Sequence, residues 1–151
     1  MPMQTQPQIE YVTALVGGQL FGVRIDRVND VFIPGRITRV PLAPAAVAGA
    51  VNLRGRVVTL IDLRKRFLLP PREESGGMVI GVELDGESFG LLVDSVGEVI
   101  LVPAESREEN PVNLDPGWAR LAGGVHALDG RLMVVLDVNR ILEIQPEALA
   151  A

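Results

Sequence analysis

Cysteine is absent from this chain of 151 residues, histidine occurs once, and serine occurs four times. The absence of cysteine excludes disulfides and thiolate metal sites. His126 has no carboxylate cluster at ligand spacing, so we interpret it as structural. No serine lies in a Gly-x-Ser-x-Gly motif, and no Gly-x-Gly-x-x-Gly or Walker A motif occurs. The sequence therefore predicts a protein that is not an enzyme and needs no metal or cofactor.

Four carboxylates are repeat-related and could be mistaken for acid–base pairs: Asp26, Asp62, Asp94 and Asp137. They follow predicted strands or begin predicted helical turns, so we assign them structural roles.

Long hydrophobic runs are also missing, since Gly, Arg, Asp or Pro interrupts every apolar stretch before it reaches membrane-spanning length. Residues 1–8 have neither a basic segment nor an apolar segment of the kind found in signal peptides, and we expect a disordered tail there. These features predict a cytoplasmic location. Apolar residues make up 48% of the chain, which is enough for a packed core.

Charge is divided unequally between the two halves of the chain. Residues 1–74 carry ten Arg or Lys and six Asp or Glu, a net +4, whereas residues 75–151 carry four and thirteen, a net −9. Halves of opposite sign are compatible with two faces for two partners, with head-to-tail assembly, or with simple drift of surface composition. All three interpretations stay open at this point.

An internal repeat relates the two halves. The segment FGVRIDRVNDV at residues 21–31 matches FGLLVDSVGEV at residues 89–99, at an offset of 68. Further on, residues 47–51, 55–56 and 61–63 match residues 121–125, 130–131 and 136–138, at offsets of 74 or 75. Because the matches keep the same order, we infer one structural unit used twice.

Each unit carries the same series of β signals. β-rich runs flank Gly17-Gly18 at residues 11–16 and 20–25, and flank Asp85-Gly86 at residues 78–84 and 87–93, which predicts two tight hairpins. Third strands are predicted at residues 28–33 and 96–102, and further strands at residues 56–61 and 131–136. Asp62 and Asp137 each predict a short helical turn as N-cap residues. The predicted fold is all-β, with two small SH3-like barrels that share an apolar interface and a groove.

The predicted boundaries follow from the repeat and from a Pro- and Gly-rich linker. They are a tail at residues 1–8, a first barrel at 9–72, a linker at 73–77, a second barrel at 78–142 and a C-terminal tail at 143–151. Small barrels often bind nucleic acid, and a basic cluster lies at residues 54–66. Six aromatic residues and an acidic second half argue against this class, which we keep as the alternative function.

The turn at Asn52-Leu53-Arg54-Gly55 differs from its repeat equivalent, Ala127-Leu128-Asp129-Gly130. Arg is a poor residue for a tight hairpin whose turn positions both need positive φ. Either Arg54 is present for recognition, as a planar donor group that meets a carboxylate, or the turn is of another type, such as type II, that accepts Arg without strain.

Residues 41–64, PLAPAAVAGAVNLRGRVVTLIDLR, closely resemble the signature of the CheW family of bacterial chemotaxis coupling proteins. Residues 21–31 fit the same family, and the resemblance covers about residues 9–144. Thr59 departs from it, since the family often has proline there. The resemblance implies a single CheW-like domain of two five-stranded SH3-like barrels.

The resemblance also implies a signal-transduction adaptor that couples a CheA-type histidine kinase, through its regulatory domain, to the cytoplasmic tips of methyl-accepting chemoreceptors. Such an adaptor would be recruited to receptor arrays at the inner membrane, and its membrane association would be indirect. The motif match implies partner-binding positions at Val28, Asp30, Val31, Gly49, Asn52, Arg54 and Gly55. Apolar or close-approach contacts are expected from Val28, Val31 and Gly49, and polar ones from Asp30 and Arg54, including with each other. A plain core role for the valines stays open.

Overall fold

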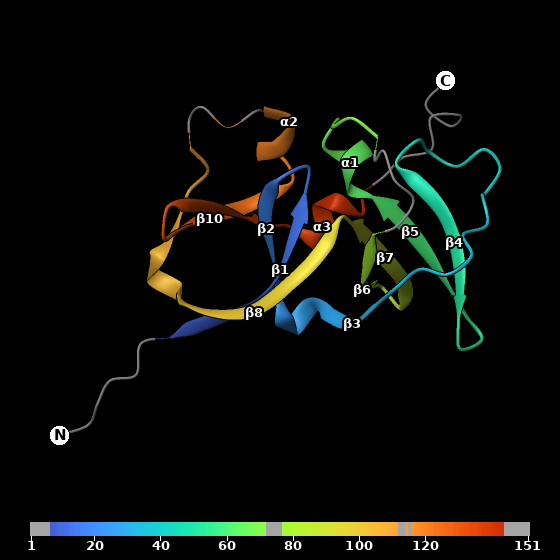
Figure 1. Ribbon diagram of the computed structural model, residues 1–151, viewed down its shortest axis with the longest axis horizontal. Helices are drawn as coiled ribbons and strands as arrows, with labels where there is room; N and C mark the ends of the chain where they lie inside the picture. The colour runs from blue at the N-terminus through green and yellow to red at the C-terminus, as the bar shows by residue number, and fades with distance from the viewer. Residues whose placement is uncertain (1–6, 72–76, 112–113, 115, 144–151) are drawn as a thin grey trace.

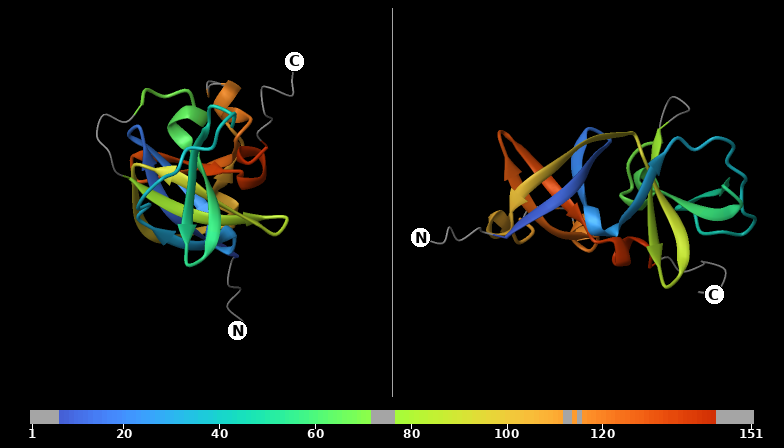
Figure 2. Two further views of the ribbon diagram at one scale, coloured as in Figure 1. Left: turned by 90° about the vertical axis from the view of Figure 1, so that its right-hand side faces the viewer. Right: turned by 90° about the horizontal axis from the view of Figure 1, so that it is seen from below.

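A computed structural model describes residues 7–71, 77–111, 114 and 116–143 and contains two β-sheets. The six-stranded barrel has the strand order β8–β1–β2–β11–β10–β9, with β1 (Gln8–Val16), β2 (Gln19–Arg24), β8 (Ser95–Pro103), β9 (Arg107–Glu108), β10 (Ala122–Leu128) and β11 (Arg131–Leu136). The five-stranded barrel has the order β3–β6–β7–β5–β4, with β3 (Val28–Phe32), β4 (Val47–Leu53), β5 (Arg56–Asp62), β6 (Met78–Leu84) and β7 (Glu87–Val93). The two barrels lie side by side along the long axis (Figure 1, Figure 2).

The predicted all-β fold is confirmed, and so are both hairpins. Gly17 and Gly18 have φ of 58° and 82°, and Asp85 and Gly86 have φ of 51° and 82°. Paired positive φ values define the tight turns that match the twist of antiparallel strands. The short β9, which the sequence did not predict, is the sixth strand of the six-stranded barrel.

The assignment of one barrel to each half of the chain is corrected by the strand order. The β1–β2 hairpin of the first unit lies in one barrel with β8, β10 and β11 of the second, and β6–β7 lies in the other with β3, β4 and β5 of the first. Four pairings join the two units: the antiparallel pairs β1–β8 and β3–β6, and the parallel pairs β2–β11 and β5–β7, in which Phe21 lies opposite Val134 and Ile61 opposite Leu91. Each repeat unit therefore donates its first hairpin to the other unit's barrel.

The predicted helical turns after Asp62 and Asp137 are present. The Asp62 side chain accepts a hydrogen bond from the Arg64 N–H at 2.9 Å and starts α1 (Leu63–Arg66). Asp137 accepts one from the Arg140 N–H at 3.2 Å and starts α3 (Val138–Ile141). A third helical turn, α2, spans Pro116–Ala119, and the 3-10 turns η1 and η2 span Ile25–Arg27 and Ala104–Ser106. Turns this short depend on packing against the barrels.

One hydrophobic core joins the barrels, as predicted. Its buried side chains come from both sheets, among them Val23 of β2 and Leu91 of β7. Three aromatic rings cross the junction: Phe21 stacks on Phe67 with ring centroids 4.9 Å apart, and Trp118 packs on Phe67 at 5.0 Å while its indole N–H donates to the Phe67 carbonyl. Each barrel also has a smaller buried cluster of its own, which includes Leu60 and Val79 in the five-stranded barrel and Tyr11 and Met133 in the six-stranded one.

A bidentate ion pair also ties exchanged elements together. Arg64 of α1 donates to both carboxylate oxygens of Asp94, at 2.8 and 2.7 Å, and Asp94 also accepts the Gly17 N–H at 2.8 Å. Both side chains are less than a quarter exposed. The pair thus joins α1, the β7–β8 connection and the β1–β2 turn.

We expect Asp94→Asn to lower the free energy of unfolding by about 2 kcal/mol, because it leaves a partly buried guanidinium without its carboxylate. The repeat equivalent Asp26 is the matched control, since its pair with Arg24 is more than half exposed on both sides. Asp26→Asn should cost no more than about 0.5 kcal/mol. Urea unfolding of both variants measures the difference, and equal losses would contradict the prediction.

Among the described residues, no helix is long and apolar enough to cross a membrane. Most of the predicted tails and linker, at residues 1–6, 73–76 and 144–151, lies outside the described residues. Gln8, predicted to lie in the tail, is the first residue of β1.

Candidate partner-binding surfaces

The conformation of the β4–β5 turn shows whether Arg54 lies in a tight hairpin turn or in a type II turn. Arg54 has φ of 54° and Gly55 has φ of 82°, so this is a tight turn with two left-handed residues and not a type II turn. The Asn52 side chain supports it by accepting the Gly55 N–H at 2.8 Å. In the other unit only Gly130 has positive φ, at 73°, and Asp129 does not. The strained turn is therefore the one that carries arginine.

Arg54 is exposed, and its guanidinium makes no hydrogen bond or ion pair with any residue that the structure describes. A left-handed conformation costs a residue other than glycine about 1–2 kcal/mol. The Asn52 hydrogen bond supports the turn, but the Arg54 side chain itself makes no contact of this kind with the described residues that would offset the cost. The strain and exposure of Arg54 are consistent with a role in recognition.

Gly49 is buried, and its contacts lie within the chain. It has φ of 148°, and a Cβ atom there would lie 2.5 Å from the Thr38 carbonyl oxygen and 2.6 Å from the Ile37 side chain. Thr38 and Ala50 exchange two backbone hydrogen bonds of 2.8 Å beside it. The missing side chain at position 49 thus lets the loop of residues 33–46 lie against β4.

The predicted residues on β3 have three different environments. Val28 is half-buried and packs against the shared core, whereas Val31 is 38% exposed. The Asp30 carboxylate lies directly over Gly81, where any Cβ atom would collide with it. Val28 therefore has the core role that was left open for the valines, whereas Val31 is available to a partner. β3 pairs only with β6, so its other edge is unpaired within the described sheets.

Sequence reasoning missed two exposed residues on β8, which is likewise an edge strand. Val99 is 51% exposed and Leu101 is 57% exposed. Both are repeat equivalents of exposed residues, since the offset of 68 relates them to Val31 and to Ile33, which is 76% exposed. All four residues at 99–102 are apolar, so an alternation of polar and apolar residues could not show which face of the strand is exposed. The comparison of the two repeat units could have shown it. β3 lies near the boundary between the barrels, and β8 runs from that boundary across the six-stranded barrel to the N-terminal end of β1 (Figure 1).

The seven predicted residues do not form a single cluster. Asn52, Arg54 and Gly55 form the β4–β5 tip. Val31 of β3 and Val99 and Leu101 of β8 are exposed on edge strands of the two different sheets, and we call these edge positions together the strand-edge surface. No hydrogen bond or ion pair joins Asp30 to Arg54 in the described residues, so the expected contact between them is wrong. The small pocket beside Asp30 is lined by Leu53 and Arg56, which flank the β4–β5 tip. The tip and β3 are therefore neighbours, whereas β8 belongs to the other sheet.

His126 is buried and structural, as predicted. Its Nε2 lies 2.9 Å from the Tyr11 hydroxyl, and its Nδ1 lies 2.9 Å from the Ser106 hydroxyl. Ser106 donates its proton to the Pro103 carbonyl, so Nδ1 carries the hydrogen and Nε2 accepts from Tyr11. Burial, aided by the nearby Arg107 charge, lowers the pKa of His126, so the ring is neutral at pH 7.

The described residues hold no group of three potential metal ligands.

The candidate acid–base carboxylates have structural partners. Asp62 and Asp137 begin α1 and α3, Asp94 binds Arg64, and Asp26 binds Arg24 at 3.2 Å. The arrangement of exposed edges and a strained tip around a packed core is typical of a protein that binds other proteins.

Comparisons with known proteins agree with this class. The family model described as the CheW-like domain matches residues 10–145. The chain is 29% identical to the chemotaxis protein CheW of Treponema pallidum, over 89% of this chain and 82% of that one, and 30% identical to the probable chemotaxis protein CheW of Rhizobium etli, over 92% and 91%. It is similar to the crystal structure of the scaffolding protein TtCheW from Thermoanaerobacter tengcongensis, with a TM-score of 0.83, 28% identity and coverage of 97% and 95%.

The family match and the shared fold define a scaffolding adaptor that is not an enzyme. The chain belongs to the CheW-like domain family and acts in chemotaxis signalling. This outcome favours the adaptor over the alternative of a nucleic-acid-binding barrel.

Proposed function

We propose that this adaptor couples a CheA-type histidine kinase to the cytoplasmic tips of methyl-accepting chemoreceptors. In this proposal the β4–β5 tip contacts the regulatory domain of the kinase, and the strand-edge surface contacts the receptor tip. The protein works in the cytoplasm and is recruited to receptor arrays at the inner membrane through these contacts. Family membership supports the role, and the exposed residues on edge strands of both sheets support contacts with two partners.

The exposed, strained Arg54 is the observation that carries the kinase contact. A guanidinium can meet a partner carboxylate with two parallel hydrogen bonds. Asn52 and Gly55 hold the turn that presents it. On the other surface, Val31, Val99 and Leu101 offer apolar area that burial by a receptor helix would remove from water.

Binding of both partners by the full chain tests the proposal. Titration calorimetry would measure the kinase regulatory domain and a receptor tip fragment from the same source, separately and together. Val99→Asp should weaken receptor binding and leave kinase binding unchanged, and Arg54→Asn should do the reverse. Failure of the unmodified chain to bind either partner would contradict the coupling role.

Arg54→Asn has a second expected effect, on stability. Asn tolerates the left-handed conformation better than Arg, so the variant should gain about 1 kcal/mol in free energy of unfolding while it loses kinase affinity. Asp129→Asn, at the repeat-equivalent turn, is the matched control: Asp129 has no positive φ, and neither property should change. Urea unfolding gives the stability. A loss of stability together with a loss of binding would show that Arg54 supports the fold.

A further inference from the structure

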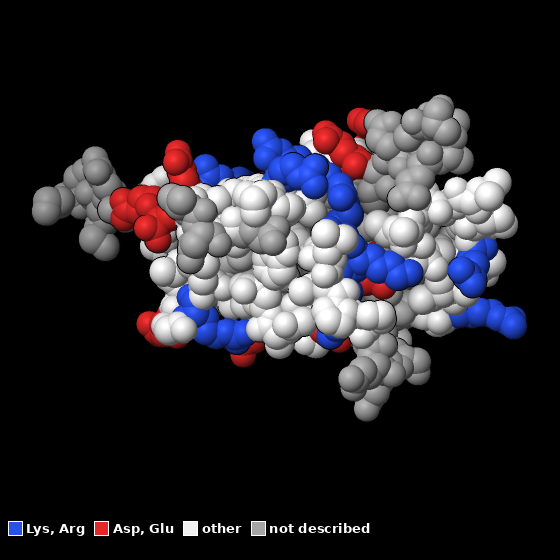
Figure 3. Space-filling view, turned by 90° about the horizontal axis from the view of Figure 1, so that it is seen from above, with Lys and Arg blue, Asp and Glu red and all other residues white. Residues whose placement is uncertain are grey.

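Two depressions adjoin α3 on the six-stranded barrel, outside both proposed surfaces. One, of about 290 Å³, is lined by Arg66, Arg120, Arg140 and Glu143. The other, of about 170 Å³, is lined by Arg24, Arg27, Arg107 and Asp137, together with Gly123 and apolar residues of β11 and α3. We call the two together the arginine groove. Lys and Arg side chains also gather on the face that carries α1 and α2 (Figure 3).

Strand exchange brings these arginines together. Arg24, Arg27 and Arg66 belong to the first repeat unit, and Arg107, Arg120 and Arg140 belong to the second. The +4 and −9 halves of the sequence therefore do not become two faces of opposite charge at this place, because each half supplies three of the six guanidinium groups.

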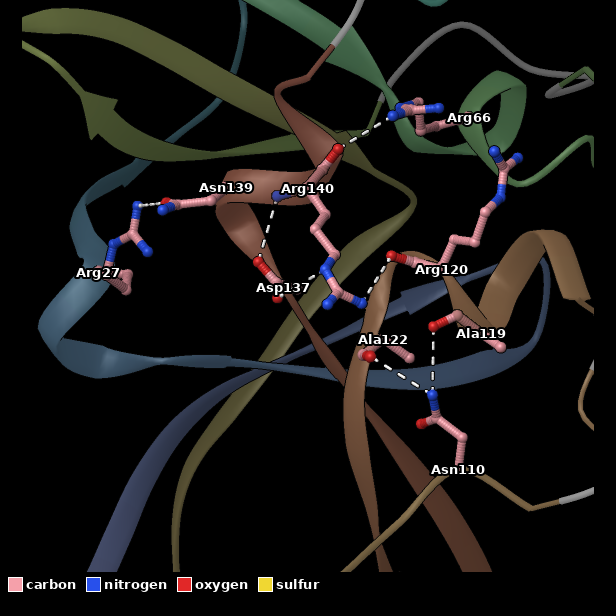
Figure 4. Close-up of polar contacts among 9 residues, drawn as sticks. All are labelled: Arg27, Arg66, Asn110, Ala119, Arg120, Ala122, Asp137, Asn139 and Arg140. Carbon is pink, nitrogen blue, oxygen red and sulfur yellow. Dashed lines mark hydrogen bonds and ion pairs between the residues drawn. The ribbon is translucent and has the colours of Figure 1, made fainter.

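Backbone and amide oxygens hold several of the groups in position (Figure 4). Arg66 donates from Nε to the Ile141 carbonyl and from Nη2 to the Arg140 carbonyl, both at 3.0 Å. Arg27 donates to the Asn139 side chain at 2.7 Å, and Arg140 donates to the Arg120 carbonyl at 3.4 Å. Carbonyl and amide oxygens orient a guanidinium without cancelling its charge, so the groove stays positive.

Arg120 has the freest charge in the groove. Its guanidinium makes no hydrogen bond or ion pair with any described residue, and it points towards that of Arg66 (Figure 4). Burial lowers the pKa of Arg66, and the charge of Arg120 lowers it further. Five carboxylates offset the six cations in part: Asp26 on Arg24, Asp137 on Arg140, Glu143 near Arg66, and Glu108 and Glu109 in a depression that Arg107 also lines. An excess of positive charge remains, and bound oxyanions would relieve its repulsion.

We propose that the arginine groove binds an acidic polypeptide segment through its carboxylate side chains. The guanidinium fork matches a carboxylate in shape and in hydrogen-bond direction. Each depression has the size of side chains rather than of an enclosed cofactor cavity, and two in succession along α3 suit residues spaced along an extended chain. The proposal is independent of the kinase and receptor contacts, because it uses none of their residues.

A fluorescein-labelled octaglutamate peptide tests the proposal on the full chain, with fluorescence anisotropy as the readout. The unmodified protein should bind it, and a matched octaglutamine peptide should not bind. Arg120→Gln and Arg27→Gln should each weaken binding, and the double variant should weaken it by about tenfold or more. Arg36→Gln, an exposed arginine outside the groove, is the control and should bind as the unmodified protein does.

Three results would overturn the proposal. The first is an absence of octaglutamate binding at about 50 mM salt, where screening is weak. The second is a loss of binding in Arg36→Gln as large as that in Arg120→Gln, which would indicate general attraction to basic surface. The third is competition by inorganic phosphate at a concentration equal to that of the peptide, which would identify a small-anion site. Urea unfolding of each variant checks that a loss of binding is not a loss of fold.

Discussion

Two separately produced halves, residues 1–74 and 75–151, are expected to be unfolded alone and to assemble into one folded complex when mixed. Neither half contains a complete barrel, because β2 pairs with β11 and β5 pairs with β7. The core that spans both barrels would also be cut into two exposed parts. Cooperative unfolding should therefore be lost completely in each half and be restored by the mixture.

Circular dichroism and sedimentation measure this directly. Each half should lack a thermal transition, and an equimolar mixture should show one transition and the mass of a single heterodimer. The single tryptophan, Trp118, packs on Phe67 of the other half, so its fluorescence should change when the halves associate. A half that folds as a monomer would contradict the prediction, because its hairpin would then have paired within its own repeat unit.

His126→Leu is expected to lower the free energy of unfolding by about 2–3 kcal/mol at pH 7. The Tyr11 hydroxyl would lose its acceptor inside the core, and an unpaired buried hydroxyl costs about 1–3 kcal/mol. Ser106 would keep its bond to the Pro103 carbonyl, which limits the loss on that side. Denaturant unfolding of the full chain measures the change.

The same substitution should remove a pH dependence. Because burial lowers the pKa of His126 in the folded protein, the unfolded chain takes up the proton first as the pH falls below about 6.5. The stability due to neutral His126 is therefore complete above that pH, and it declines by up to about 1.4 kcal/mol per pH unit until the folded pKa is reached. Unfolding between about pH 7.5 and 5.5 should show this slope in the unmodified protein and a smaller one in His126→Leu. Equal slopes would show that other groups cause it.

Local features of this fold could be predicted from the sequence, but which strands pair with one another could not. Gly17-Gly18 and Asp85-Gly86 set their hairpins by turn chemistry, and Asp62 and Asp137 set the helical turns by capping, all within a few residues. Which hairpin enters which barrel depends on long-range pairing. Since the two units present similar apolar strands, the repeat itself suggests the wrong pairing, within each unit.

The candidate site shows the same division. Arg54 could be singled out because a residue type and a turn conformation disagreed at one position. The exposure of Val99 and Leu101 depends on β8 lying at a sheet edge, and the arginine groove depends on the exchange of hairpins. Both are properties of the assembled fold, so no window of the sequence contains them.

The exchange of hairpins also sets the order of events while the ribosome makes the protein. β2 ends at Arg24, but β11, the strand with which it pairs, begins only at Arg131. At typical rates of synthesis the first hairpin waits for roughly 5–20 seconds before its barrel can close. During that time its unpaired edges are open to other chains. The apolar first hairpin is therefore the segment that a chaperone at the ribosome would need to shield.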